Sequence, residues 1–240
     1  VESFFISRYY YLHALYWPLK KPKNFLSLAK AIVNEDSSKR NQMEMDPQRL
    51  LEIRPRNYAN LLDALMTDWA AAQGKKRWGD KSPGYVTKLA LLQRLYPDAK
   101  FVHIIRDGRD VWLSLKNLGW ETNVVKVAKT WASVIRKARQ YGKNRIPSNY
   151  YELRYEDLIS QPEEELKKIL RFLGEPYTDE LLHHGKTNGR NIAFKGWPKI
   201  NEGIEAGNRN KWEKELSVEE IVLCESQAAP VLRELGYALF

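Results

Sequence analysis

The chain has 240 residues, of which 43% are hydrophobic and 29% are charged, a composition typical of a globular protein with one full core. Its formal net charge of +9 indicates either an anionic partner or a solvated basic surface, and charge alone does not decide between them. Cys224 is the only cysteine, which excludes an intrachain disulfide and any cysteine-based metal site.

The same features predict where the protein works. One cysteine and no Asn-x-Ser/Thr triplet favour a cytoplasmic location. No apolar run reaches the roughly 18 residues that a membrane-spanning helix needs, so no transmembrane segment is predicted. The aromatic start of the chain lacks the basic beginning of a signal peptide. Because the first residue is Val1 rather than Met, we expect an upstream piece to be missing.

The first part of the chain is predicted to be helical. Apolar and aromatic residues at helical spacing indicate helices at residues 4–17, 24–33 and 58–73, and residues 34–47 are polar enough for a loop. Gly74 follows the third of these helices as a stop signal.

The next block of the sequence predicts a crossover unit. Residues 76–78 suit a short strand and residues 84–97 a helix. Residues 101–105 form an apolar run with little alternation, which suits a parallel strand covered on both faces. A strand, a helix and a strand in that order make the sheet parallel.

The rest of the chain is predicted as a helix, a buried strand, a helix, a loop and a closing helix, at residues 124–142, 150–158, 162–174, 185–212 and 217–236. The second helix starts with proline and acids and ends at glycine, as a capped helix does. Ser217 and Glu220 form a capping box at the start of the closing helix. The class is therefore α/β, with helices on both faces of a parallel sheet.

The strand at residues 101–105 runs into RDGRD, a turn with two arginines. Gly108 permits a tight turn, and the start of the next helix offers free N–H groups that suit a phosphate. Arg106 adds a forked cationic donor, and Ser114 can donate its hydroxyl from the inward side of the helix. Alternatively, Arg106 and Asp107 form a surface ion pair and Ser114 bonds a backbone carbonyl. Both interpretations stay open.

The segment GDKSP, residues 79–83, is predicted to lie at the same edge of the sheet, since ligands bind outside the carboxyl ends of parallel strands. Asp80 would cap the following helix. Lys81 would project into the cleft, where a lysine can neutralise charge on a leaving group. The alternative is that Lys81 is one more solvated lysine of a basic protein.

Four segments, in order along residues 79–217, resemble motifs of the sulfotransferases that use 3′-phosphoadenosine-5′-phosphosulfate (PAPS). FVHIIRDGRDVWLSL resembles the segment of that family that binds the 3′-phosphate, and Arg106 and Ser114 fall on its arginine and serine. WGDKSP resembles a motif of the bacterial and tyrosylprotein-like branches. Its lysine, matched by Lys81, contacts the transferring sulfate.

The other two segments lie later in the chain. In LRYEDLISQP, Tyr155 matches a tyrosine of the family that reaches the nucleotide. GNRNKWEKELS resembles a basic loop that closes over the cofactor, with Arg209 and Lys211 as alternative contacts. The family's loop for the 5′-phosphosulfate is absent. VESFFIS resembles the tract that follows that loop, which would make Glu2 the catalytic base.

The resemblance implies a P-loop-NTPase-like, three-layer α/β fold with a central parallel sheet and helices on both faces. It also implies a single domain over residues 1–240, whose first strand and phosphosulfate loop would lie upstream of residue 1. The expected reaction moves a sulfuryl group from PAPS to a hydroxyl or amine of a small-molecule, carbohydrate or peptide acceptor, without a metal. Residues 4–17 either line an apolar acceptor pocket or belong to the core.

Two other functions fit parts of the sequence. A nucleotide-dependent kinase of related fold would need a lysine-bearing phosphate loop, and none is present in this chain. A non-catalytic protein that binds polyanions would follow from the charge of +9. No motif of aromatic and basic residues typical of nucleic-acid binding occurs, so no nucleic-acid partner is predicted.

Overall fold

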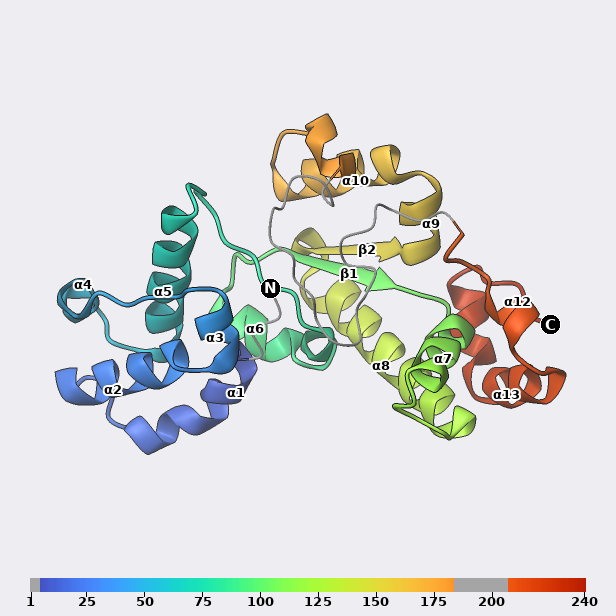
Figure 1. Ribbon diagram of the computed structural model, residues 1–240, viewed down its shortest axis with the longest axis horizontal. Helices are drawn as coiled ribbons and strands as arrows, with labels where there is room; N and C mark the ends of the chain where they lie inside the picture. The colour runs from blue at the N-terminus through green and yellow to red at the C-terminus, as the bar shows by residue number, and fades with distance from the viewer. Residues whose placement is uncertain (1–4, 184–206) are drawn as a thin grey trace. The chain divides into compact units, whose positions relative to one another are not determined.

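The computed structural model describes residues 5–183 and 207–240. Its contacts divide the chain into two compact units, Val1–Ala99 and Lys100–Phe240, each of which is described by itself (Figure 1). That the two units form one domain stays a prediction. Among the described helices, none is both long enough and apolar enough to cross a bilayer.

The first unit is helical. Its elements are α1 (Phe5–Leu12), the 3₁₀ helix η1 (His13–Tyr16), α2 (Pro22–Val33), α3 (Asp36–Arg40), α4 (Pro47–Glu52), α5 (Tyr58–Ala72), the 3₁₀ helix η2 (Pro83–Thr87) and α6 (Leu89–Leu95). The core lies between α2 and α5, where Leu28, Ile32, Leu61 and Leu65 are fully buried. Gly74 has a φ of +67°, the left-handed conformation that favours glycine after a helix. The predicted stop signal of α5 is therefore confirmed.

Three details of this unit differ from the prediction. Part of the expected loop at residues 34–47 is the short helix α3, and the expected helix at residues 84–97 is divided into η2 and α6. Residues 76–78 form no strand in the described structure. The reason is that Trp78 packs on helices: its indole N–H donates to Asp63 of α5 at 3.0 Å, and its ring meets Tyr96 edge to face.

The second unit contains a parallel pair of strands, β1 (Phe101–Ile105) and β2 (Tyr150–Arg154). The connection between them contains α7 (Gly108–Asn117), α8 (Val124–Arg145) and the 3₁₀ helix η3 (Pro147–Asn149). The parallel sheet is therefore confirmed, but the predicted crossover through residues 84–97 is wrong. The strand that pairs with β1 follows it along the chain rather than preceding it.

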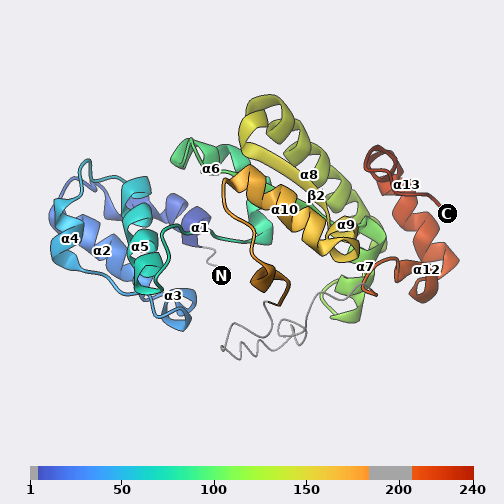
Figure 2. The ribbon, with the colours of Figure 1, turned by 90° about the horizontal axis from the view of Figure 1, so that it is seen from above.

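Helices cover both faces of this sheet. Tyr150 of β2 packs against Gly142 of α8, whereas its neighbour Tyr151 meets Phe172 of α10 (Pro162–Leu173). Successive side chains of a strand point to opposite faces, so α8 and α10 lie on opposite sides of β2, as Figure 2 shows. The predicted arrangement of helices on both faces is confirmed for these two strands.

The chain after β2 is helical wherever the structure describes it. The remaining elements are α9 (Tyr155–Ser160), the 3₁₀ helix η4 (Asp179–His183), α12 (Trp212–Glu215) and α13 (Val218–Glu234). The predicted strand at residues 150–158 is too long, because α9 begins at Tyr155. The capping box at Ser217 and Glu220 is confirmed at the start of α13, which packs on α8 to form the core.

Candidate functional site

The ends of β1 and β2 lie side by side. The register pairs Ile105 with Arg154, the last residue of each strand, so the next residues, Arg106 and Tyr155, leave the sheet together. The guanidinium carbon of Arg106 lies 5.1 Å from the centre of the Tyr155 ring, within the range of a cation–π contact. The structure thus brings together two of the residues that the sequence predicted at a nucleotide site.

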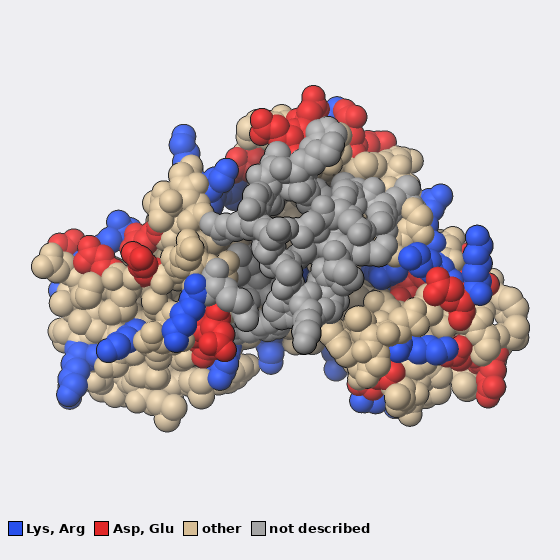
Figure 3. Space-filling view, in the orientation of Figure 1, with Lys and Arg blue, Asp and Glu red and all other residues tan. Residues whose placement is uncertain are grey.

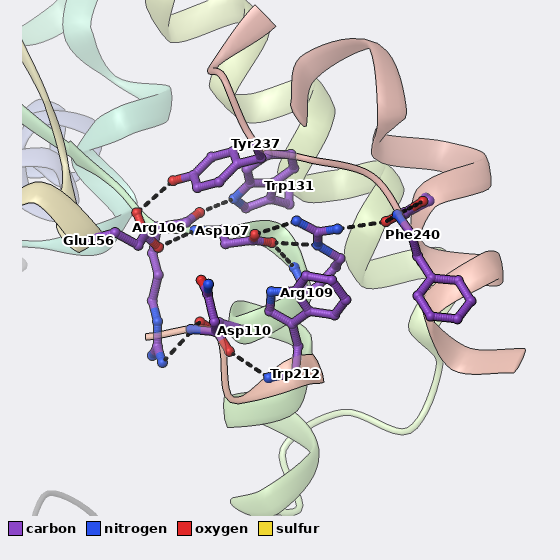
Figure 4. Close-up of polar contacts among 11 residues, drawn as sticks. Arg106, Asp107, Arg109, Asp110, Trp131, Glu156, Trp212, Tyr237 and Phe240 are labelled. Atoms are coloured by element: carbon purple, nitrogen blue, oxygen red, sulfur yellow. Dashed lines mark hydrogen bonds and ion pairs between the residues drawn. The ribbon is translucent and has the colours of Figure 1, made fainter. Parts of the chain in front are cut away.

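The segment at residues 208–212 lies against this pair. The Asn208 side-chain amide donates to the Tyr155 hydroxyl at 2.9 Å, and the Asn208 carbonyl accepts a 3.4 Å hydrogen bond from Arg106. Asp110 holds the segment in place, because its carboxylate accepts the backbone N–H groups of Asn210 at 2.9 Å and Trp212 at 3.0 Å (Figure 4). The predicted late basic loop therefore reaches the carboxyl edge of the sheet.

Asp110 contributes a buried negative charge beside Arg106. Its side chain is fully buried, with Oδ2 at 4.0 Å from Nη2 of Arg106. Burial raises the pKa of the Asp110 carboxyl, and the N–H of Trp212 and the charge of Arg106 oppose that rise. Asp110 thus positions the segment and orients Arg106 at the same time.

Arg106 keeps unused donors in this arrangement. Its side chain is 24% exposed, and its Nε atom is buried without a hydrogen-bond partner among residues 5–183 and 207–240. A guanidinium has five N–H donors in a fixed fork, which matches the oxygens of a phosphate or sulfate. The site is therefore suited to an oxyanion at the end of β1.

The other charged residues of RDGRD have structural partners. Asp107 accepts the backbone N–H of Arg109 at 2.8 Å and so caps α7. The guanidinium of Arg109 donates to Asp107 at 2.7 Å and to Glu225 of α13 at 2.6 Å, and its side chain is only 2% exposed. The alternative in which Arg106 and Asp107 form a surface ion pair is wrong, since Asp107 is buried and pairs with Arg109 (Figure 4).

Gly108 is required for a different reason from the one predicted. A Cβ atom at this position would lie 2.8 Å from the Trp131 ring, closer than real contacts allow. Trp131 stays in this place because its indole N–H donates to the Arg106 carbonyl at 3.2 Å. The glycine therefore permits the close approach of α8 to the turn.

The glutamate of the RYEDL motif, Glu156, has a structural role. Its buried carboxylate accepts the Asp107 N–H at 2.9 Å and the Tyr237 hydroxyl at 2.8 Å. These two bonds tie the end of β1 to the end of β2 and to the C-terminal residues. Sequence reasoning missed Glu156, Asp110 and Asn208. The i,i+4 spacing of Arg106, before α7, and Asp110, on α7, was the one local signal available.

The other residues predicted to contact the cofactor are Ser114, on α7, and Arg209 and Lys211, which precede α12. Ser114 is half-buried on α7, and its hydroxyl forms no hydrogen bond within residues 5–183 and 207–240, so the predicted alternative of a bond to a backbone carbonyl is not seen. Arg209 donates to the Ser160 hydroxyl at the end of α9, at 2.6 Å. Lys211 is half-buried directly before α12.

The two predicted catalytic residues, Lys81 and Glu2, belong to the other part of the chain, Val1–Ala99. Lys81 is exposed in the first unit, and the strand expected to carry it to the sheet edge does not form. Asp80 accepts a 2.6 Å hydrogen bond from the Tyr85 hydroxyl, and the N-cap of η2 is Ser82, so the predicted capping role of Asp80 is wrong. Glu2 lies outside the described residues.

Known proteins resemble this chain in sequence. It is 27% identical over 168 residues to protein-tyrosine sulfotransferase A of Caenorhabditis elegans, a match covering 66% of this chain and 44% of that protein. It is 33% identical over 107 residues to omega-hydroxy-beta-dihydromenaquinone-9 sulfotransferase Stf3 of Mycobacterium tuberculosis, covering 39% of this chain and 28% of that protein. The chain thus spans less than half the length of these two relatives.

The fold and the family follow from two further matches. The sulfotransferase domain from the curacin biosynthetic pathway superposes with a TM-score of 0.60 at 19% identity, covering 88% of this chain and 79% of that domain. The predicted α/β fold is therefore confirmed as that of sulfotransferase domains. The family model of the sulfotransferase family matches residues 5–179 of this chain. The chain therefore belongs to this family.

Proposed function

We propose that this protein transfers a sulfuryl group from PAPS to a hydroxyl of an acceptor and releases adenosine 3′,5′-bisphosphate. Membership of the sulfotransferase family supports the reaction class. The observation that supports the site is the buried Nε of Arg106 at the end of β1, which has no hydrogen-bond partner in the described part of the chain. An unpaired buried donor costs free energy, and an anionic oxygen at this place removes that cost.

In this proposal the 3′-phosphate lies between Arg106 and Ser114. Arg106 supplies permanent charge and forked donors, and Ser114 donates its hydroxyl from α7. The ring of Tyr155 packs near the nucleotide beside the guanidinium that already lies over it. Arg209 or Lys211, on the segment that Asp110 anchors, contacts the cofactor from its other side.

The proposed transfer needs positioning and charge stabilisation more than covalent help, as phosphoryl transfer does. The acceptor oxygen forms a bond to sulfur while the bond from sulfur to the 5′-phosphate oxygen breaks. Glu2 would accept the proton of the acceptor hydroxyl. Lys81 would offset the charge that develops on the transferring sulfate and the leaving phosphate oxygen.

The acceptor class is narrowed by the names of the relatives. One is named for protein tyrosine and the other for omega-hydroxy-beta-dihydromenaquinone-9, and both named substrates carry a hydroxyl group. We therefore expect a hydroxyl rather than an amine acceptor here, on a peptide, a carbohydrate or a small molecule. The cytoplasmic location stays a prediction.

The test is calorimetric binding of adenosine 3′,5′-bisphosphate to the full-length protein. Loss of a charged hydrogen-bond donor to phosphate should weaken binding about 10- to 100-fold in the Arg106→Ala variant. Arg136→Ala is the matched control, because it removes an exposed arginine of α8 and should leave the affinity unchanged.

Activity is then measured with labelled PAPS and a panel of phenols, alcohols, peptides and sugars. Equal affinity of the Arg106→Ala variant and the wild type would remove Arg106 from the site. No transfer to any acceptor, together with no binding of the bisphosphate, would contradict the proposed function. ATP in place of PAPS tests the kinase alternative in the same assay.

A further inference from the structure

An exposed cluster of aromatic, aliphatic and basic side chains lies where α1 and η1 turn into α2. Its apolar members are Tyr11, Leu15 and Trp17, which are 62%, 80% and 68% exposed. The exposed lysines Lys20 and Lys21 follow in the turn, and the exposed Lys23 is the second residue of α2. We call these six residues the aromatic–lysine tip.

Helical spacing explains why the apolar members face outward. Ile6 and Tyr9 occupy the inward side of α1 and are 2% and 7% exposed. Tyr11 follows Tyr9 by two residues and so lies on the other side of α1, whereas Leu15 is exposed on the 3₁₀ helix η1. The predicted role of residues 4–17 in the core is therefore confirmed only for their inward side.

The turn that carries the lysines is firmly held. Leu19 is 2% exposed and anchors the turn in the core of the first unit. The Lys21 N–H donates to the Pro18 carbonyl at 3.1 Å, and Arg56 donates to the Lys20 carbonyl at 3.4 Å. The aromatic–lysine tip is thus held in a defined position on the first unit.

The charge of this region is of one sign. Residues 5–34 contain five lysines and arginines and no acidic residue. Arg8 pairs with Glu35 at 3.2 Å, whereas the three lysines of the tip form no ion pair with any described residue. A fourth lysine, Lys88, has its ammonium 5.4 Å from the centre of the Tyr11 ring. Figure 3 shows basic side chains projecting over the end of α2 at the lower left.

We propose that the aromatic–lysine tip binds the surface of an anionic lipid bilayer. Tryptophan and tyrosine rings favour the interface between headgroups and acyl chains, and an exposed leucine gains from entering the apolar layer. Lysines beside them are attracted to anionic headgroups. An apolar layer with a negatively charged surface satisfies both halves of the tip at once, as in interfacial anchors.

A second basic surface of the protein provides the contrast. Helix α8 presents the exposed cations Lys129, Arg136 and Lys137 in the second unit, with no large apolar residue of that helix among the exposed ones. Such a face attracts anions without inserting into a bilayer. It therefore serves as a charge-matched control for the tip.

The test is cosedimentation of the full-length protein with phosphatidylcholine vesicles, with and without one third phosphatidylserine. We expect binding only to the anionic vesicles. The triple variant Lys20→Gln, Lys21→Gln, Lys23→Gln should weaken it about 100-fold, since each lysine near such a surface is worth roughly fivefold. The double variant Leu15→Ser, Trp17→Ser should weaken it at least about tenfold.

The charge-matched variant Lys129→Gln, Arg136→Gln, Lys137→Gln should change binding only a few-fold, because these charges lie off the contact and salt screens them. An equal loss of vesicle binding in this control variant would overturn the proposal, because it would show that net charge alone drives the binding. Absence of binding to anionic vesicles would overturn it as well. So would a dimer in solution that the Leu15→Ser, Trp17→Ser variant dissociates while vesicle binding persists.

Discussion

The two arginines of RDGRD stand three residues apart and serve different purposes. Arg109 is buried, pairs with Asp107 and Glu225, and lies with its guanidinium carbon 3.6 Å from the centre of a Trp212 ring. Arg106 is partly exposed and keeps a donor that no described residue pairs with. One arginine joins α7 to α13, and the other is available to a ligand.

This difference predicts that the two alanine variants lose stability to different extents. Arg109→Ala leaves two carboxylates without their partner and should lower the free energy of unfolding by about 3–5 kcal/mol. Arg106→Ala should lower it by less than about 1 kcal/mol, because its ion pair is long and partly solvated. Urea unfolding followed by circular dichroism measures both. Similar losses in the two variants would contradict the assignment.

At the scale of elements, the segment at residues 207–212 depends on α7. Asp110 holds two of its backbone N–H groups, and Asn208 then meets Tyr155 and Arg106. The segment therefore closes on the ends of both strands without any regular structure of its own before α12. Its position is set by one buried carboxylate rather than by local propensity.

Replacing that carboxylate should loosen the segment. Asp110→Ala is expected to speed amide hydrogen exchange at Asn210 and Trp212, because both N–H groups lose their acceptor. It should also weaken binding of adenosine 3′,5′-bisphosphate about tenfold through the lost anchor. Glu121→Ala is the control, since Glu121 pairs with the exposed Lys126 and with no other residue in the described ranges. Unchanged exchange at both amides would show that other contacts hold the segment.

The ends of the elements show where long-range contacts override the local sequence pattern. The run YYELRYEDL keeps a strand-like pattern through residue 158, yet β2 ends at Arg154. Glu156 bonds the Asp107 N–H and the Tyr237 hydroxyl, which turns the chain into α9. Neither partner is near it in sequence, so the end of this strand was not predictable from the local pattern.

At the scale of the whole molecule, the second unit holds a partly buried titratable group on its sheet, near α8. His103 of β1 hydrogen-bonds through Nδ1 to the Tyr150 hydroxyl at 2.6 Å. Glu152, Arg139 and Lys143 form an ion-pair cluster beside it. Burial lowers the pKa of His103 to about 4, with Glu152 opposing and Arg139 adding to that shift.

This shift predicts how stability depends on pH. The unfolded histidine titrates near 6.5, so between that value and about 4 the unfolded chain binds a proton that the folded chain does not. The free energy of unfolding should therefore fall by about 3 kcal/mol as the pH drops through this range. Burial alone would raise the pKa of the Glu152 carboxyl, but its hydrogen bond with Arg139 lowers that pKa below the ordinary value of 4.5. The stability that the ionised Glu152 contributes is therefore lost at lower pH.

Urea unfolding at several pH values measures this dependence. His103→Gln removes the titrating group, and its stability should stay nearly level between pH 6.5 and about 4. An equally steep fall in the variant would assign the dependence to other groups.

The sequence by itself determined the elements whose signals are local. The apolar run of β1, the capped helix at residues 162–174 and the capping box of α13 were all predicted, because neighbouring residues carry their patterns. Arg106 and Tyr155 were also predicted as neighbours of one ligand, through motifs. Only the tertiary structure decided which strand pairs with β1 and which charges of RDGRD are buried. Those outcomes depend on partners such as Glu225 and Tyr237, more than 80 residues away along the chain.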